Sequence, residues 1–532
     1  MTSSTSGGDW IDICAPSEID DSRGRRVTIN GTDVAVLRDG DDIHAVGGLC
    51  PHRGGQLADG TVVDGTVVCP LHHWDFDLRS GISPYDPNDR VPVYRARIRD
   101  DRVEIDATSV PPGPGRPDEY LGPWIRRGAR DRGMHDVHAL AGGQGPALGA
   151  MGSVRLDPAH DGGHRRYPSL DDLVFRPAQL HRLPLLDHEP VDTTVVLGSR
   201  AGAPLRLDIP LFVSHMSFGA LGREAKIALA TGARTCGTAI CSGEGGMLPD
   251  ERAAAGAYVL EMASGYFGWT DEAVASCDAV EIKIGQGAKP GLGGQLPASK
   301  VTAEIAAVRG LPPGAASHSP SRFPDINSPA DLAARVRAIR QTNPRIPIGI
   351  KFAAGDVEAD LAVAIEAGAD WVTIDGFGGG TGAAPLHVKD HVGIPSWTVI
   401  RRARRWLDHH GAADVQLVAT GGYRTPDEMA KLLALGADAV ALATSALMAI
   451  GCQQYRACHV GTCPVGIATQ DPLLRSRLDV DVSAQRLHTF LTSATSMIVD
   501  YCRLTGHRAV AELGIDDLEV LAKDTAVLLG LG

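Results

Sequence analysis

The sequence predicts a small all-β domain followed by a (β/α)₈ barrel with a helical C-terminal end. Short β-prone runs separated by Gly and Asp turns fill residues 9–106. From about Ser169, apolar strand-like runs alternate with helical stretches. The chain has 532 residues, 43% of them hydrophobic, so a large globular core is expected. A doubly wound α/β sheet is the alternative for the second unit.

The first unit is expected at residues 9–108. A linker and loop-rich segment follows at residues 109–165, where Pro, Gly, Arg and Asp are abundant and no periodicity is visible. The β runs of the first unit are Val27–Ile29, Asp33–Leu37, Ile43–Val46, Val62–Val63, Val67–Val68 and Val103–Ile105.

The barrel is expected at residues 166–482, with closing helices at 483–532. Helices fit between most of its strands, at Glu224–Arg234, Ala330–Thr342, Asp356–Ala367 and Pro426–Leu435. The eight strand-like runs are Ile209–Phe218, Thr238–Ser242, Ala279–Gly285, Ala315–Ser319, Ile346–Phe352, Trp371–Gly376, Val415–Gly421 and Ala439–Thr444.

Charge and hydropathy exclude several classes of protein. The net charge of −13 argues against nucleic acid or an anionic membrane as the main partner. No apolar run reaches the length of a transmembrane helix, and the first 20 residues carry no secretory signal. We therefore expect a cytoplasmic protein, in which the ten cysteines are metal ligands or core residues rather than disulfides.

Four residues of the first unit form a metal-binding pattern. Cys50-Pro51-His52 is followed after 16 residues by Cys69-Pro70-Leu71-His72. Two Cys and two His can hold one zinc ion, or a 2Fe–2S cluster with Cys₂ on one iron and His₂ on the other. Each loop supplies one Cys and one His, which favours the diiron cluster over zinc.

This part of the chain resembles a Rieske domain through the run CPHRGGQLADGTVVDGTVVCPLHHWDFDLRSG. Neither ligand loop has an additional Cys, since Arg53, Gly54 and Gly55 follow His52. The resemblance is therefore to the low-potential, ferredoxin type of Rieske domain. It implies a 2Fe–2S cluster held by Cys50, His52, Cys69 and His72.

A second cysteine pattern lies near the end of the barrel. Cys452, Cys458 and Cys463 have C-x₅-C-x₄-C spacing, and three thiolates this close can bind an iron–sulfur cubane that lacks one iron. Three unrelated core thiols are the alternative. The other five cysteines, which stand singly in apolar contexts, are expected in the core.

Glycine-rich turns follow the last two barrel strands. Gly421 and Gly422 let the backbone approach an anion, and Ala443 and Thr444 lie at the end of the eighth strand, where barrels often bind phosphate. Beside iron–sulfur clusters, a phosphate site suggests FMN. Lys351 should point into the same mouth and stabilise negative charge on the flavin, unless it only snorkels to the surface.

Charged side chains at the same mouth suit a dicarboxylate amino acid. Lys283 lies near the end of the run Ala279–Gly285 and Lys289 follows it, Glu244 follows Thr238–Ser242, and Arg309 lies further on. The cations would bind carboxylates and the Glu would bind an amine. A solvated charged surface is the alternative.

From about Tyr167 to Gln470 the chain is similar to the FMN-binding synthase domain of glutamate synthase. The matching runs are MSFGALGREA, SGEGG, ASGYFGWT, EIKIGQGAKPGLGGQLP, GGGTGAAPL and the cysteine run. The resemblance implies a (β/α)₈ barrel, FMN and a 3Fe–4S cluster on the three cysteines. By position it assigns Lys351, Lys289 and Glu244 to catalysis. It assigns Ser217, Lys351, Gly379, Gly380, Gly421, Gly422, Ala443 and Thr444 to the cofactor, and Glu244, Lys283, Lys289, Gln295 and Arg309 to the substrate.

Two departures from the family pattern bear on the substrate. Tyr266 stands where the family usually has Arg, and Phe377-Gly378 replace a His-Asp pair. Both positions are expected near the substrate mouth. Thr2 follows Met1, so the nucleophilic Cys of a glutaminase is missing, and no G-x-G-x-x-G motif follows a strand, so an NAD(P)H-binding domain is not expected.

These features predict an oxidoreductase that passes electrons between a Rieske cluster, a 3Fe–4S cluster and FMN. It would reduce a C=N or C=C bond, or run the reverse oxidation, on an amino acid- or oxo acid-like substrate. The expected partner is an external electron donor or acceptor such as a ferredoxin or flavin reductase, and a homo-oligomer is compatible with the sequence. Glutamate N-alkyl transfer of the N-methylglutamate synthase type is the main alternative, and a Rieske oxygenase is a weaker one.

Overall fold

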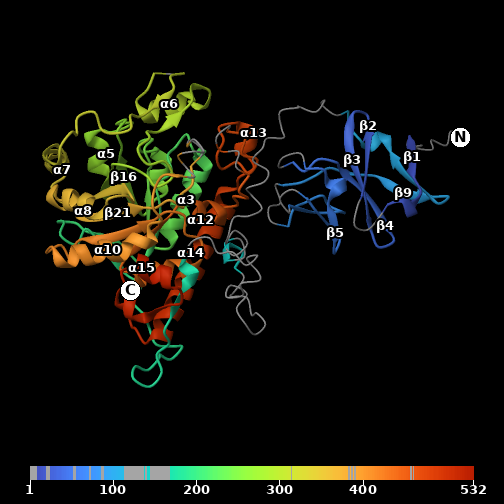
Figure 1. Ribbon diagram of the computed structural model, residues 1–532. Coiled ribbons are helices and arrows are strands. Elements are labelled where there is room, and N and C mark those ends of the chain that lie inside the picture. Colours follow the sequence, from blue (N-terminus) through green and yellow to red (C-terminus); the bar gives the residue numbers. More distant parts are fainter. Residues whose placement is uncertain are drawn as a thin grey trace.

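The computed structural model shows a β-rich N-terminal unit, an eight-stranded closed barrel and a helical C-terminal segment (Figure 1). This order confirms the predicted fold class. The structure describes residues 9–19, 24–51, 55–70, 74–84, 89–112, 137, 140–143, 168–312, 314–381, 384, 388, 391–455, 458 and 461–531.

The N-terminal unit consists of three antiparallel sheets, ordered β2-β3-β4-β8, β5-β6-β7 and β1-β10-β9. Strand β3 is buried on both faces. Val34 and Val36 pack into a core between the sheets β2-β3-β4-β8 and β1-β10-β9. Ala35 and Leu37, on the other face, pack into the core that contains Cys50 and Cys69. The strands are β1 (Trp10–Cys14), β2 (Arg25–Ile29), β3 (Thr32–Asp39), β4 (Asp42–Gly47), β5 (Thr61–Val63), β6 (Thr66–Val68), β7 (Asp75–Asp77), β8 (Val93–Tyr94), β9 (Ala96–Arg99) and β10 (Arg102–Asp106).

The barrel is formed by eight parallel strands, and β23 pairs with β14 to close it. Their carboxyl ends therefore meet at one mouth, where barrel enzymes carry their active sites. The strands are β14 (Leu211–Val213), β15 (Ala239–Cys241), β16 (Ala257–Met262), β17 (Ala279–Lys283), β20 (Ile348–Ala353), β21 (Trp371–Asp375), β22 (Gln416–Thr420) and β23 (Ala439–Leu442).

One of the eight predicted barrel strands was wrong. The run Ala315–Ser319 contributes only the two-residue β19 (Ser317–His318), which pairs with β18 (Gln295–Leu296) outside the barrel. The missing barrel strand is β16, whose sequence AYVLEM is rich in residues that also favour helices. Pairing with β15 and β17 on both sides makes it a strand, so the barrel context overrides local propensity.

Helices connect the barrel strands and are started by local capping. Helix α11 follows the loop after β22, with Thr425 and Glu428 forming a capping box and Pro426 in its first turn. Helix α14 begins after Asp479 and ends at Gly506. The helices are α3 (Arg223–Thr235), α4 (Pro249–Ala254), α5 (Asp271–Ser276), α6 (Ala303–Arg309), α7 (Pro329–Thr342), α8 (Val357–Glu366), α10 (Trp397–His409), α11 (Pro426–Ala434), α12 (Thr444–Ala449), α13 (Pro472–Arg475), α14 (Val480–Thr505) and α15 (Lys523–Leu528).

The C-terminal segment packs on the barrel. Helix α14 lies against α3, and β24 (Leu518–Val520) pairs with β11 (Leu173–Phe175), which precedes the barrel. The remaining short strands, β12 (Val195–Leu197) and β13 (Leu205–Leu207), form a hairpin ahead of β14. The end of the chain is thus joined to the start of the barrel unit.

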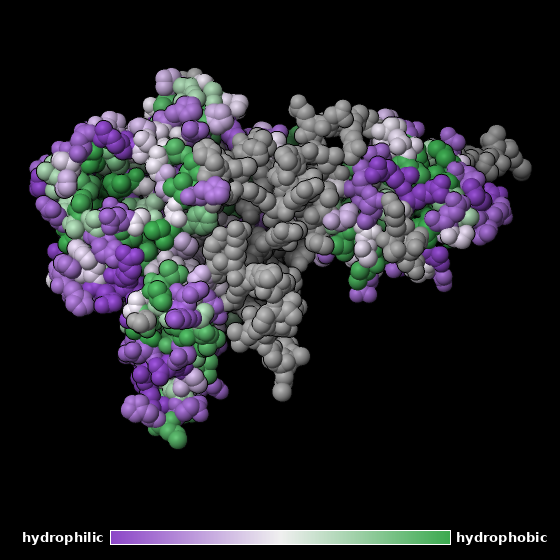
Figure 2. Space-filling model, in the orientation of Figure 1, coloured by the Kyte–Doolittle hydropathy of each residue, from purple (hydrophilic) through white to green (hydrophobic). Residues whose placement is uncertain are grey.

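Hydrophilic and hydrophobic residues are interspersed over the surface of both units on the face seen in Figure 2. Within the part of the chain that the structure describes, every helix is too short or too polar to cross a lipid bilayer.

Candidate functional site

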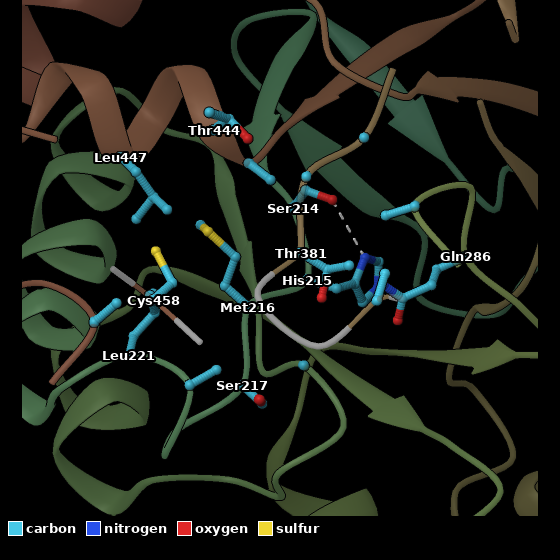
Figure 3. A pocket seen from close by; sticks show the side chains of 18 of the residues that line it. Ser214, His215, Met216, Ser217, Leu221, Gln286, Thr381, Thr444, Leu447 and Cys458 are labelled. Atoms are coloured by element: carbon cyan, nitrogen blue, oxygen red, sulfur yellow. Dashed lines mark hydrogen bonds between the residues drawn. The ribbon is translucent and has the colours of Figure 1, made fainter. Parts of the chain in front are cut away.

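A cavity of about 650 Å³ lies at the carboxyl ends of the barrel strands, a size typical of small-molecule sites. Figure 3 shows side chains that converge on it from the strand ends and from α12, with the sulfur of Cys458 on one side. All sixteen site residues predicted in the barrel line this cavity, namely Ser217, Glu244, Lys283, Lys289, Gln295, Arg309, Lys351, Gly379, Gly380, Gly421, Gly422, Ala443, Thr444, Cys452, Cys458 and Cys463.

The glycine-rich turns after β21 and β22 lie backbone to backbone. Gly421 and Gly422 have φ values of 130° and 99°, which side chains rarely adopt. A Cβ on Gly422 would lie 2.0 Å from the carbonyl oxygen of Gly378. On the same turn as Gly378, a Cβ on Gly380 would lie 3.1 Å from Oγ1 of Thr444. This side-chain-free cradle fits the phosphate end of FMN.

A buried carboxylate, Glu261 on β16, links two of the predicted lysines. Lys283 Nζ donates to Glu261 Oε1 and Lys351 Nζ donates to Glu261 Oε2, each at 3.3 Å. Burial alone would raise the pKa of Glu261, but the two ammonium groups outweigh it and hold the pKa well below its usual range. Glu261 was not among the predicted site residues, because the strand that carries it was not predicted from its sequence.

Two further buried groups beside Glu261 were not predicted either. His215 follows β14, and its Nε2 lies 3.4 Å from Glu281 Oε1 and 3.6 Å from Glu261 Oε2. Burial, reinforced by the charge of Lys351, lowers the pKa of His215 well below its ordinary value, so the ring is neutral. Burial raises the pKa of Glu281 to about 7. No spacing pattern in the sequence pointed to either residue.

Glu244 is held by groups from three segments. Lys283 Nζ donates to its Oε2 at 2.6 Å, and Ser319 Oγ donates to its Oε1 at 3.0 Å. Burial raises the pKa of Glu244, but the neighbouring Lys283 more than compensates, so the carboxyl is ionised. Gly294 packs directly on this carboxylate, where a Cβ would lie 1.6 Å from Oε1. The interpretation of Glu244 and Lys283 as a solvated surface pair is therefore wrong.

The other two cations face the same cavity. Lys289 Nζ donates to the carbonyl oxygen of Gly293 at 2.7 Å. The Arg309 guanidinium donates to Ser317 Oγ at 2.9 Å and to the carbonyl oxygen of Phe218 at 2.7 Å. Its Nε is buried and has no hydrogen-bond partner among the described residues. A buried N–H donor without a hydrogen-bond partner fits a site for an anionic group.

Cys452, Cys458 and Cys463 are all part of the cavity lining. The backbone N–H of Gln454 donates to the Cys452 sulfur over 3.4 Å, and Lys300 Nζ donates to the Cys458 carbonyl oxygen at 2.7 Å. Three thiols in one cavity lining are the ligand types that a 3Fe–4S cluster needs, but nowhere in the described residues do three or more His, Cys, Asp or Glu side chains gather in the arrangement of a metal site.

In the N-terminal unit, Cys50 and Cys69 are both buried in the same core. The Cys50 N–H donates to the Gly55 carbonyl oxygen at 2.8 Å, and the Cys69 N–H donates to the Trp74 carbonyl oxygen at 2.6 Å. The other two predicted ligands, His52 and His72, lie outside the described residues. Two buried thiols on adjacent loops fit one half of the predicted donor set.

The two substitutions expected at the substrate mouth lie off the cavity. Neither Tyr266 nor Phe377 is part of its lining. Tyr266 has a φ of 51°, and its hydroxyl donates to Asp325 at 2.6 Å while Arg335 donates to it at 3.2 Å. The backbone N–H of Phe377 donates a hydrogen bond to the carbonyl oxygen of Ile394. The cavity wall is thus built without either of them.

Comparison with known proteins adds two family matches. A model of the conserved region in glutamate synthase matches residues 166–508, and a model of the Rieske [2Fe-2S] domain matches residues 9–95. The glutamate synthase large subunit-like protein of Rhizobium meliloti is 38% identical over 387 residues, covering 69% of this chain and 88% of its own length.

Two other relatives are similar to about two thirds of this chain. The archaeal glutamate synthase [NADPH] of Methanocaldococcus jannaschii is 40% identical over 339 residues, which cover 63% of this chain and 65% of its own length. The archaeal-type glutamate synthase [NADPH] of Thermotoga maritima is 39% identical over 347 residues, which cover 65% and 67% respectively. The matched part of this chain spans about two thirds of these two relatives.

Proposed function

Because the chain belongs to the glutamate synthase family of FMN-dependent iron–sulfur oxidoreductases and also carries a Rieske [2Fe-2S] domain, we propose that it acts on a dicarboxylic amino acid or oxo acid. The reaction would reduce a C=N bond, or a C=C bond, or run as the reverse oxidation. The proposal depends on one observation: the glycine cradle, the three cysteines and the buried cations line a single cavity.

The charges of the cavity support a dicarboxylic substrate. Lys289 and Arg309 are positively charged groups that can bind carboxylates, and the free Nε of Arg309 is a donor still without a partner among the described residues. Glu244 is an ionised acceptor that can bind an amine or ammonium group. Since Tyr266 and Phe377 lie off the cavity, their departure from the family pattern does not by itself argue against such a substrate.

When bound, FMN exchanges a hydride with the substrate and the iron–sulfur clusters exchange single electrons. Ser217 and the turns at Gly379-Gly380 and Gly421-Gly422 would hold the flavin, and Cys452, Cys458 and Cys463 the 3Fe–4S cluster. Lys351, fixed by Glu261, places a positive charge in the cavity and would stabilise negative charge on the reduced cofactor. Lys289 and Glu244 are the groups placed to move or hold a proton.

The cofactors imply an external partner. An electron donor or acceptor such as a ferredoxin or a flavin reductase would exchange electrons at the Rieske domain, and we place this exchange in the cytoplasm.

Cofactor content tests the proposal. The protein is purified anaerobically, its iron and acid-labile sulfide are counted, its flavin is released and identified, and its clusters are recorded by EPR. We expect FMN, a Rieske signal and a 3Fe–4S signal. Absence of FMN would overturn the proposal.

Matched cysteine variants assign each cluster. C69S should lose only the Rieske signal and C463S only the 3Fe–4S signal. The controls C14S and C502S, at buried thiols of the two units, should keep both signals.

The direction of electron flow is tested by redox titration of all three centres. A Rieske potential well above that of the flavin would contradict the reductive direction and support substrate oxidation. N-alkyl transfer makes a different prediction, because exchange of glutamate and methylamine would then proceed without any reductant.

A further inference from the structure

An aromatic contact joins the N-terminal unit to the barrel. The rings of Trp74 and Tyr455 have centroids 5.0 Å apart and are tilted by 56°, which is a favourable geometry for an aromatic pair. Both side chains are buried, with 6% and 3% of their surface exposed. The two residues are 381 positions apart in the sequence, so the contact is formed only by docking of the two units.

Each ring belongs to a predicted cluster site. Trp74 accepts the backbone hydrogen bond of Cys69 through its carbonyl oxygen at 2.6 Å. Tyr455 lies in the loop between Cys452 and Cys458 and lines the barrel cavity together with all three cysteines. Cys50, Cys69, Trp74, Tyr455 and Cys463 belong to one continuous buried cluster.

We propose that the Trp74–Tyr455 contact docks the Rieske domain on the barrel and holds its two-cysteine site beside the three-cysteine loop. Tyr455 is a positioning residue: its ring meets the Rieske domain on one side and the cavity on the other. The proposal deepens the proposed function and rests on it for the identity of the two clusters. It adds a defined route of contact between them within one chain.

The physical reason is the distance dependence of electron exchange, which falls steeply as two centres separate. Covalent connection raises the effective concentration of one unit near the other, so a small contact area suffices for docking. A ring pair also excludes water from the space between the sites. Loss of either ring should release the Rieske domain without removing a single cluster ligand.

The test compares full-length Y455A, W74A and Y455F with the wild type. Y501A is the control, because Tyr501 makes a comparable ring contact with Phe175, at 4.5 Å, between α14 and β11. The first measurement is the spin relaxation of the reduced Rieske signal, which a nearby paramagnetic 3Fe–4S cluster accelerates. The second is the radius of gyration from solution scattering of the same samples.

We expect Y455A and W74A to keep wild-type iron content, to lose the relaxation enhancement and to increase in radius of gyration. Y455F keeps the ring and should behave as the wild type, as should Y501A. Unchanged relaxation and an unchanged radius in both alanine variants would overturn the proposal. If the wild type itself lacks one of the clusters, the proposed function fails, and the scattering comparison still decides the docking contact.

Discussion

Glu261 is the residue on which the charges of the cavity depend. Its side chain is fully buried, and Lys283 and Lys351 donate to its two oxygens from neighbouring strands of the barrel. Buried ionised groups are tolerated only when paired and hydrogen-bonded, and removal of one partner leaves an uncompensated charge. Glu281, which is in register with Glu261 across β16 and β17, is buried as well but has a pKa of about 7.

We predict that E261Q destabilises the protein by about 3–5 kcal/mol, because two buried ammonium groups lose their counter-charge. E281Q is the matched control. At about pH 6 the Glu281 carboxyl is already protonated, so an isosteric amide should cost less than about 1.5 kcal/mol. Denaturant unfolding of the two variants measures the difference. Equal losses of stability would contradict the assignment of the charge to Glu261.

Glu281 also predicts a pH dependence. The unfolded chain releases this proton near the ordinary pKa of 4.5, whereas the folded chain keeps it up to about pH 7. The folded state therefore binds more protons in this window, and the free energy of unfolding falls as the pH rises through it. Relative to E281Q, the wild type should lose stability between pH 4.5 and 7, by on the order of 3 kcal/mol. Unfolding curves that run parallel across this range would contradict it.

At the scale of the elements, one strand leaves room for a side chain from the next. Gly349 on β20 is in register with Glu281 on one side and with Trp371 on the other. The Trp371 indole lies over Gly349, and its Nε1 donates to Glu281 Oε2 at 3.1 Å. The Trp371 side chain on β21 thus reaches Glu281 on β17, because Gly349 on the strand between them has no side chain.

We predict that G349A destabilises the barrel by about 1–3 kcal/mol, the usual cost of overpacking. The added Cβ would lie 2.1 Å from the Trp371 ring, which is buried and has no space to move. The control is G355A, just beyond the end of the same strand, where the nearest atom to a Cβ is 3.9 Å away. It should be neutral or slightly stabilising, within about 1 kcal/mol. Thermal unfolding of both variants tests this, and a neutral G349A would contradict the packing argument.

At the scale of the whole molecule, one cavity brings together residues from nearly every barrel loop. Glu244, Lys289, Arg309 and the cysteine loop come from separate segments between residues 214 and 468. A ligand that bridges these segments binds only the folded chain and should therefore stabilise it.

We predict that glutamate or 2-oxoglutarate raises the unfolding temperature of the FMN-loaded protein. A ligand at 100 times its Kd adds about 2.7 kcal/mol. Lysine, a basic amino acid, is the ligand control, and K289M is the protein control, since it removes a cation that lines the cavity. A rise of the same size in K289M would contradict binding at this site.

Much of the site was predictable from local sequence. The cysteine spacings and the turns at Gly421-Gly422 are local patterns, and local patterns carry the chemistry of ligands and of backbone approach. Lys283, Lys289 and Lys351 were informative because the chain has only eight lysines. By contrast, Glu261 and Glu281 lie singly in apolar strands and His215 lies just after one, and no motif or spacing marks any of the three.

The two units follow from the sequence alone, which also predicts the cluster ligands and the glycine cradle, because each depends on residues that are close along the chain. Tertiary structure decided which strand completes the barrel, since AYVLEM becomes β16 only when it is paired on both sides. It also decided that Glu261 joins Lys283 to Lys351, that Tyr266 lies off the cavity, and that Trp74 meets Tyr455. These are contacts between distant segments, and only the packing of the folded chain brings such segments together.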